Sequence, residues 1–149
     1  MEISSKKRGM TVMYVRLNIR TTTAEELVDI TEDVENAVEK SEVKDGLCIV
    51  FAKHTTAGIL INEAVDANLR EDIIRAFEEI IPKIKFKHEC SRRNAAAHIK
   101  ATIIGAEKII PVKDSKLELG RWQGIFFAEF DGPRSRTVVV EVIPDKNAV

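Results

Sequence analysis

The sequence predicts an α+β fold: a single domain in which a mixed or antiparallel sheet packs against two to three helices. The chain has 149 residues, the length of one domain, without an internal repeat or linker. Segments that alternate apolar and polar residues, as strands do, outnumber segments with helical spacing. Most of these strands are joined by short turns, which favours antiparallel pairing. Residues 13–149 are expected to form the domain, and residues 1–12 a flexible N-terminal tail.

The first half of the chain predicts three strands and one helix. Residues 13–20 alternate strictly and form the first strand. The spacing of Thr23 and Glu26 is that of a capping box, and it predicts a helix whose apolar stripe is Leu27, Ile30, Val34 and Val38. Two further strands are expected over residues 47–53 and 59–62, on either side of a polar break.

The second half predicts two helices and up to four strands. Asp66 caps a helix whose buried face is expected to be Leu69, Ile73, Phe77 and Ile80. A brief strand is expected over residues 84–87, then a polar loop over 88–93 and a short helix over 94–104, closed by Gly105. The last strands are expected over residues 107–112, 121–130 and 136–143.

Composition and charge limit the classes of function. The chain carries 23 Lys and Arg against 24 Asp and Glu, and 5% of its residues are aromatic. This argues against a nucleic-acid-binding protein, which needs a basic excess or aromatic platforms for bases. No apolar run reaches the roughly 20 residues of a membrane helix, and the N-terminus lacks the apolar core of a signal peptide. We therefore expect a cytoplasmic protein without a membrane partner.

Three histidines are the candidates for a metal site. His54 follows a strand at the rim of the sheet, His98 shares a helical face with Asn94, and His88 lies ten residues before His98. Three histidines with an open fourth position are typical of catalytic zinc. The sequence has no His-Glu-x-x-His motif and no paired Cys-x-x-Cys motif, so three unrelated histidines are the alternative interpretation.

A carboxylate and two arginines are candidates for acid–base chemistry and anion binding. Asn62 and Glu63 follow the apolar residues of a short strand, where Glu63 is either a cap of the next helix or a general base in a cleft. Arg136 begins the row of core-facing residues on its strand. There it is either a buried, ion-paired residue or a phosphate ligand. Arg134 lies in a Gly-Pro turn, as a solvated turn residue or a second phosphate ligand.

The strand expected over residues 121–130 predicts a subunit interface. Trp122, Phe126 and Phe130 share one face, which is expected to be the core. Ile125 and Phe127 lie at the centre of the other face, among polar and charged residues. Two large apolar side chains on an outer face are unfavourable on a monomer, so this face is expected to contact another copy of the chain.

In order and spacing, these motifs resemble those of the YjbQ family, also called the secondary thiamine-phosphate synthase family. The resemblance covers about residues 50–140 and rests on His54-Thr55-Thr56-Ala57-Gly58, Ile61-Asn62-Glu63, Asp72, His88, Asn94-x-x-x-His98, Gly105, Leu119-Gly120-x-Trp122-Gln123 and Gly132-Pro133-Arg134-x-Arg136. The chain departs from the family before Asn94, where Arg92-Arg93 replace acidic residues.

The resemblance implies a homotrimer with a histidine-lined pocket and a weak transferase activity, which joins a pyrimidine methyl diphosphate to a thiazole phosphate and releases pyrophosphate. Carried onto this chain, it makes His54, His88 and His98 ligands of a divalent metal, zinc first and magnesium as the alternative with a diphosphate substrate. Glu63 and His54 are the expected catalytic groups. The expected substrate-binding residues are Thr55, Thr56, Asn62, Asn94, Arg134 and Arg136. The alternative is a non-catalytic trimer that binds a metal or a phosphorylated metabolite.

Overall fold

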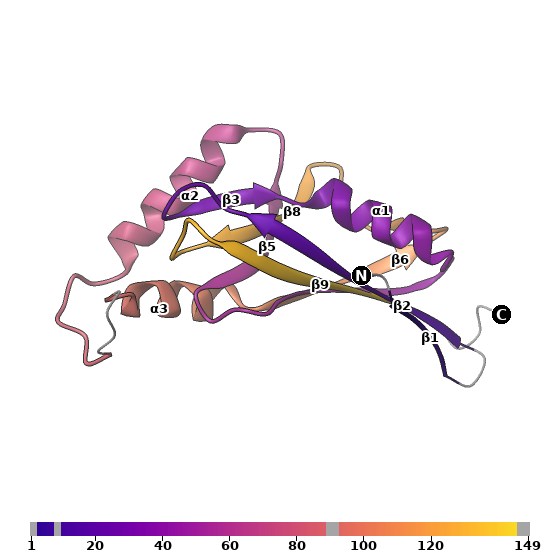
Figure 1. Ribbon diagram of the computed structural model, residues 1–149. Helices are drawn as coiled ribbons and strands as arrows, with labels where there is room; N and C mark the ends of the chain where they lie inside the picture. Colours follow the sequence, from indigo (N-terminus) through magenta and orange to yellow (C-terminus); the bar gives the residue numbers. More distant parts are fainter. Residues whose placement is uncertain (1–2, 8–9, 89–92, 146–149) are drawn as a thin grey trace.

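A computed structural model describes residues 3–7, 10–88 and 93–145. Its strands are β1 (Ile3–Lys7), β2 (Met10–Arg20), β3 (Glu26–Asp29), β4 (Gly46–Ala52), β5 (Ala57–Glu63), β6 (Glu107–Lys113), β7 (Lys116–Leu117), β8 (Gln123–Glu129) and β9 (Ser135–Pro144). Its helices are α1 (Thr31–Ser41), α2 (Ala67–Ile80) and α3 (Ala95–Ile104). The predicted α+β class is confirmed (Figure 1).

The strands form two antiparallel sheets. The larger sheet has the order β1-β2-β9-β4-β6-β7, and the smaller sheet has the order β3-β8-β5. The main core contains the inner face of the larger sheet, one face of the smaller sheet and the apolar stripe of α1. A second cluster lies on the other face of the smaller sheet, where α3 and part of α2 cover it. Both faces of the smaller sheet are therefore buried.

The position of α3 depends on close backbone contact with β5. Gly105 ends the helix with a φ of 89°, a conformation that favours glycine. Its carbonyl oxygen accepts a hydrogen bond from the Ile59 N–H at 3.1 Å. A Cβ on Gly58 would lie 2.5 Å from that same oxygen. The two glycines thus let α3 pack against the strand, which places Asn94 and His98 beside the end of β4.

The first predicted helix begins later than expected. The backbone N–H groups of Thr22 and Thr23 do donate to the Glu26 carboxylate, as in a capping box. However, residues 26–29 form β3, which pairs with β8, and α1 begins at Thr31. Leu27 consequently packs in the second cluster, whereas the rest of the expected stripe, Ile30, Val34 and Val38, lies in the main core.

The expected faces of the strand over residues 121–130 are partly wrong: Phe126 and Phe130 are buried in the second cluster as expected, but the other assignments fail. Ile125 and Phe127 are fully buried in the main core and do not form an outer face. Trp122, expected in the core, is 57% exposed. The physical reason is that β8 is the middle strand of a sheet buried on both sides. The predicted interface therefore loses the observation that motivated it.

Other boundaries also differ from the expectations. Residues 84–87 are not a strand, and β7 was not predicted. Within the expected N-terminal tail, residues 3–7 and 10–12 have strand structure. The Asp66 cap is confirmed, because its side chain accepts from the Asn68 N–H at 2.9 Å, but the apolar stripe of α2 is only partly buried and Ile80 is 66% exposed. In the described part of the chain, no helix has the length and apolar character needed to cross a membrane.

Candidate functional site

Three segments of the chain cross between the two sheets at the same edge. They connect β2 with β3, β4 with β5, and β8 with β9. They meet because β2, β9 and β4 are adjacent in the larger sheet, and β3, β8 and β5 are adjacent in the same order in the smaller one. Backbone groups in such connections lack strand partners and need other polar partners. Polar side chains accordingly gather at this edge.

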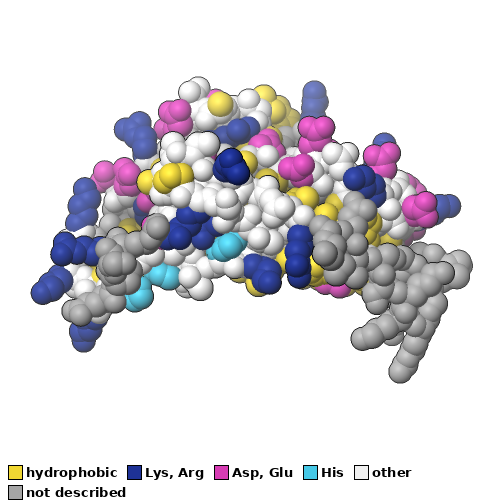
Figure 2. Space-filling view, in the orientation of Figure 1, with side chains coloured by type: hydrophobic (Ala, Val, Ile, Leu, Met, Phe, Trp, Pro, Cys, Tyr) yellow, Lys and Arg dark blue, Asp and Glu magenta, His cyan; other side chains and the backbone are white. Residues whose placement is uncertain are grey.

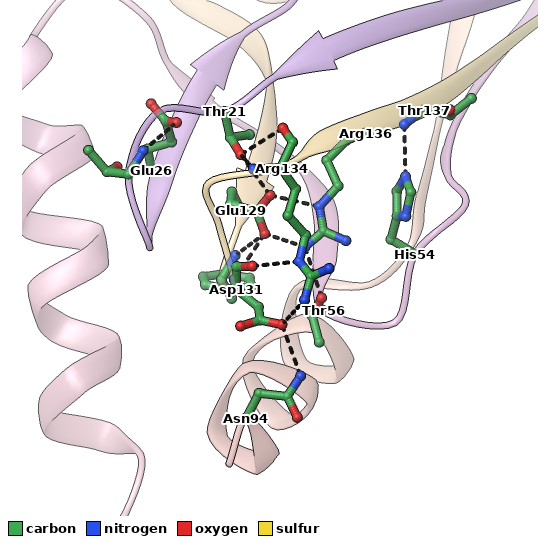
Figure 3. A network of polar contacts seen from close by, with 12 residues as sticks. Thr21, Glu26, His54, Thr56, Asn94, Glu129, Asp131, Arg134, Arg136 and Thr137 are labelled. Carbon is green, nitrogen blue, oxygen red and sulfur yellow. Dashed lines mark hydrogen bonds and ion pairs between the residues drawn. The ribbon is translucent and has the colours of Figure 1, made fainter. Parts of the chain in front are cut away.

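A buried ion pair joins these segments. Glu129, at the end of β8, is 0% exposed, and Arg136, near the start of β9, is 6% exposed. Arg136 Nε donates to Glu129 Oε2 at 2.7 Å, and one terminal guanidinium nitrogen donates to Glu129 Oε1 and, at 2.9 Å, to Thr56 Oγ1 (Figure 3). Glu129 Oε1 also accepts from the N–H groups of Phe130 and Asp131, at 3.0 and 2.9 Å. These hydrogen bonds offset the desolvation of both charges.

Thr21 connects the third segment to this pair. Its hydroxyl accepts from the Arg134 N–H at 2.8 Å and donates to Glu129 Oε2 at 3.0 Å. Burial raises the pKa of Glu129, but hydrogen bonds from Arg136, the Asp131 N–H and Thr21 outweigh it and hold the pKa below its ordinary value. The carboxylate is ionised at neutral pH. The structure thus shows Arg136 in an ion pair, and the contacts with Glu129 and Thr56 use three of its five N–H donors.

A cleft of about 530 Å³ opens beside the ion pair. It is lined by the end of β4, the segment that follows β4, the start of α3 and the turn after β8. Seven of the predicted site residues line it: His54, Thr55, Thr56, Asn94, His98, Arg134 and Arg136. Lys53 and Asp131 add a cation and a carboxylate. Figure 2 shows histidine side chains close to Lys and Arg side chains on the lower part of the molecule.

The backbone of β9 holds His54 in one tautomer. The Thr137 N–H donates to His54 Nε2 at 2.8 Å (Figure 3), so the proton of the neutral ring lies on Nδ1. Partial burial lowers the pKa of His54, and the positive charge of Arg136 lowers it further, against a smaller opposite effect of Glu129. At neutral pH the imidazole is therefore uncharged and has a single N–H donor.

We expect the stability of the protein to fall as the pH drops below about 6.5, the ordinary pKa of histidine, and to fall more steeply than in a His54→Gln variant. Below this pH the unfolded chain binds a proton at His54, whereas the folded chain, with its lowered pKa, does not. The contribution of His54 is complete above the unfolded pKa and is lost as the pH falls toward the folded pKa. Urea denaturation of both proteins at pH 7 and pH 5 measures the difference. If wild type and His54→Gln lost the same free energy of unfolding between pH 7 and pH 5, the lowered pKa of His54 would be contradicted.

Arg134 and Asn94 converge on Asp131. Arg134 Nε donates to the Asp131 carbonyl oxygen at 2.8 Å, and a terminal nitrogen donates to Asp131 Oδ2, also at 2.8 Å. The Asn94 side-chain amide donates to the same Oδ2 at 2.9 Å. The side chain of Arg134 is 31% exposed, so its guanidinium is both oriented by Asp131 and accessible from the cleft.

The described residues do not fit the expected three-histidine metal centre. The rings of His88 and His98 are in contact, with centroids 4.9 Å apart. His54 lines the same cleft as His98, but the lone pair of its Nε2 accepts the Thr137 N–H. Within residues 3–7, 10–88 and 93–145, no group of three or more His, Cys, Asp or Glu side chains is placed to hold a metal ion.

Asn62 and Glu63 lie away from the cleft. They end β5, whose other end, Ala57, follows the cleft residue Thr56. At about 3.3 Å per residue, six residues of strand separate Glu63 from Ala57 by roughly 20 Å. Glu63 instead pairs in register with Gln123 at the start of β8. Within one chain, the structure does not bring Glu63 together with His54.

Four polar residues described at this edge were not predicted as site residues: Thr21, Lys53, Glu129 and Asp131. A signal for Glu129 is nevertheless present in the sequence. Glu129 and Arg136 flank one turn, and each ends a row of apolar residues on its own strand. Opposite charges in such positions predict a buried pair, since either charge alone would be strongly unfavourable. Asp131 lies three residues before Arg134, a spacing that allows an ion pair within the turn.

A protein-family model and two related proteins with the same family description match this chain over most of its length. The family model described as UPF0047 protein YjbQ-like matches residues 15–145. A UPF0047 protein of Methanocaldococcus jannaschii is 47% identical over 135 residues, which cover 90% of this chain and 96% of that protein. The UPF0047 protein YugU of Bacillus subtilis is 40% identical over 134 residues, with coverages of 88% and 99%.

Solved structures agree with these matches. The crystal structure of a YbjQ-like protein from Sulfolobus solfataricus has a TM-score of 0.86 at 43% identity and covers 91% of this chain and 99% of its own. The structure of a hypothetical protein from Aeropyrum pernix has a TM-score of 0.83 at 36% identity, with coverages of 89% and 98%. The sequence and the fold thus match the same group of proteins over nearly their whole length.

Proposed function

The chain belongs to the UPF0047 YjbQ-like family, and from that premise we propose that it binds a phosphorylated small metabolite in the cleft beside His54. The observation that carries the proposal is the set of three cations, Lys53, Arg134 and Arg136, around one cleft. A phosphate ester or diphosphate has negative charge and several acceptor oxygens. Guanidinium and ammonium groups bind such oxygens through charge-assisted hydrogen bonds.

Both arginines keep donors for a ligand. A guanidinium has five N–H donors. Arg134 uses two of them on Asp131, and Arg136 uses three on Glu129 and Thr56. The carboxylates orient the two side chains, and the remaining N–H groups serve phosphate oxygens. The Nδ1–H of neutral His54 and the Thr55 hydroxyl supply uncharged donors at the same cleft.

A thiamine-phosphate-forming transferase is the second candidate function, favoured by the same three cations. In that reaction the bond between the pyrimidine methylene carbon and the diphosphate oxygen breaks, and its electron pair leaves with pyrophosphate. A bond from the thiazole nitrogen to the same carbon forms. Arg134 and Arg136 would stabilise the charge that develops on the leaving diphosphate. The thiazole nitrogen attacks with its lone pair and loses no proton, so this step needs no general base and is compatible with the position of Glu63.

Isothermal titration calorimetry with inorganic pyrophosphate tests the binding proposal. We expect wild type to bind, and Lys53→Ala and Arg134→Ala to lose at least about tenfold in affinity, because a hydrogen bond to a charged group contributes about 1.5–3 kcal/mol. Arg121→Ala is the matched control, since Arg121 is exposed near the opposite end of β8. No binding by wild type, or full affinity in Arg134→Ala, would refute the proposal. Turnover of the two phosphorylated precursors by wild type, lost in Arg134→Ala, would establish the transferase.

We also propose that the protein is cytoplasmic, forms a homotrimer and binds a divalent metal, either zinc or magnesium. For zinc, His88 and His98 would supply two neighbouring ligands, and a third would have to come from outside this pair. Elemental analysis of the purified protein, compared with a His98→Ala variant, decides the metal question.

A further inference from the structure

A second cavity lies on the opposite face of α3 from the cleft. His98 lines the cleft, whereas Ala96 and Lys100, each two residues away from it, line a separate cavity of about 360 Å³. Two residues of α-helix turn the chain by about 200°, so the two cavities lie on opposite sides of the helix. We call the second cavity the α3 pocket. Its other lining residues come from the end of α2 and the segment after it: Glu78, Ile81, Pro82, Lys83 and Phe86.

Lys100 is an unusually buried charge in this pocket. It is 4% exposed, and its Nζ donates to Glu25 Oε1 at 2.5 Å. A lysine ammonium has three N–H donors, and in the part of the chain that the structure describes Glu25 is its only hydrogen-bond partner. The other carboxylate oxygen of Glu25, Oε2, is also buried and has no partner there. Unused donors on a buried ammonium are unfavourable, so an acceptor bound in the pocket would stabilise this arrangement.

The rest of the lining suits a small molecule with one negative charge and an apolar body. Lys83 is exposed and adds a second ammonium group. Carboxylate oxygens accept charge-assisted hydrogen bonds from such groups. Ile81 is 7% exposed and Phe86 is half-buried, so both offer apolar surface for a ligand to cover. Glu78 is exposed on the last turn of α2 and disfavours a second negative charge, which argues against a phosphate in this pocket.

We propose that the α3 pocket binds a small carboxylate with an apolar body, either a free acid or an apolar amino acid. The carboxylate lies between Lys100 and Lys83, and the apolar part contacts Ile81 and Phe86. In an amino acid, the ammonium group pairs with Glu78. The volume of about 360 Å³ is at the lower end of the range for small-molecule sites, about 300–1,000 Å³. This site is separate from the cleft and does not depend on the function proposed there.

Isothermal titration calorimetry with 3-phenylpropionate and L-phenylalanine tests the site. We expect wild type to bind at least one of them, and 3-phenylpropanol, which lacks the carboxylate, to bind at least about tenfold more weakly. Lys83→Ala should also weaken binding by at least about tenfold, because it removes a hydrogen bond to a charged group. Lys85→Ala is the matched control, since Lys85 is exposed on the same segment and does not line the pocket. A preference for phenylalanine that Glu78→Gln removes identifies an amino acid as the ligand, and a preference for phenylpropionate identifies a free acid.

Two variants test the pocket from the side of α3. Ala96→Leu fills the pocket and should abolish binding. Glu25→Gln/Lys100→Met removes both charges of the buried pair, a change that often leaves stability unaffected, and it should weaken binding by at least about tenfold. Arg134→Ala alters only the cleft and should bind as wild type does, which separates this site from the phosphate site. Because Lys83 is exposed, Lys83→Ala decides the question even if the α3 variants do not fold. Wild type that binds neither ligand, Lys83→Ala that binds as well as wild type, or a folded α3 variant with wild-type affinity would overturn the inference.

Discussion

Replacing Glu129 with alanine lowers the free energy of unfolding by about 3–5 kcal/mol, as expected when one partner of a buried ion pair is removed. The Arg136 guanidinium then stays buried without its carboxylate. The N–H groups of Phe130 and Asp131 also lose their acceptor. Urea denaturation at pH 7, where Glu129 is ionised in wild type, measures the loss.

The control is the double variant Glu129→Leu/Arg136→Met, which removes both charges and keeps apolar volume. Replacing a whole buried pair with apolar residues is often neutral, so we expect the double variant to be clearly more stable than Glu129→Ala. If the single and double variants lost the same free energy, the charge of Arg136 would not be the cause. In that case the ion pair would not be the interaction that holds the three connecting segments together.

Replacing Phe127 with alanine lowers the free energy of unfolding by about 3–5 kcal/mol, the usual cost of a fully buried phenylalanine. Phe127→Asp is expected to prevent folding, because it places an unpaired carboxylate in the main core. Trp122→Ala is the matched control on the same segment. Trp122 is 57% exposed, so we expect a change of less than about 1 kcal/mol. If Trp122→Ala lost more free energy of unfolding than Phe127→Ala, Trp122 would be the core residue and Phe127 the outer one, as expected from the sequence.

The elements that sequence reasoning places well are those determined by local pattern. The alternation of residues 13–20, the Asp66 cap and the Gly105 helix end each depend on residues close in the chain, and all are present in the structure. Residues 26–29 show the limit of this approach. The Glu26 carboxylate accepts the Thr23 N–H, which is one half of a capping box, but pairing with β8 makes residues 26–29 a strand, because tertiary contacts override local propensity.

The same distinction applies to the candidate site. Polar residues at the ends of neighbouring strands converge, so His54, Thr56, Arg134 and Arg136 could be predicted together. The position of Glu63 and the two faces of β8 depend on the presence of a second sheet, which no local pattern reveals. The tautomer of His54 depends on a single contact with the Thr137 N–H, 83 residues away. Such long-range contacts decide the chemistry of the cleft.

A crystal structure of the protein with bound pyrophosphate tests the central claim most directly. We predict density for the anion between Arg134 and His54, with oxygen atoms 2.7–2.9 Å from guanidinium nitrogens, the usual length of charge-assisted hydrogen bonds. The Glu129–Arg136 pair should remain intact in that complex. An empty cleft at saturating pyrophosphate, or an anion bound only at another surface, would contradict the assignment of this cleft as a phosphate site.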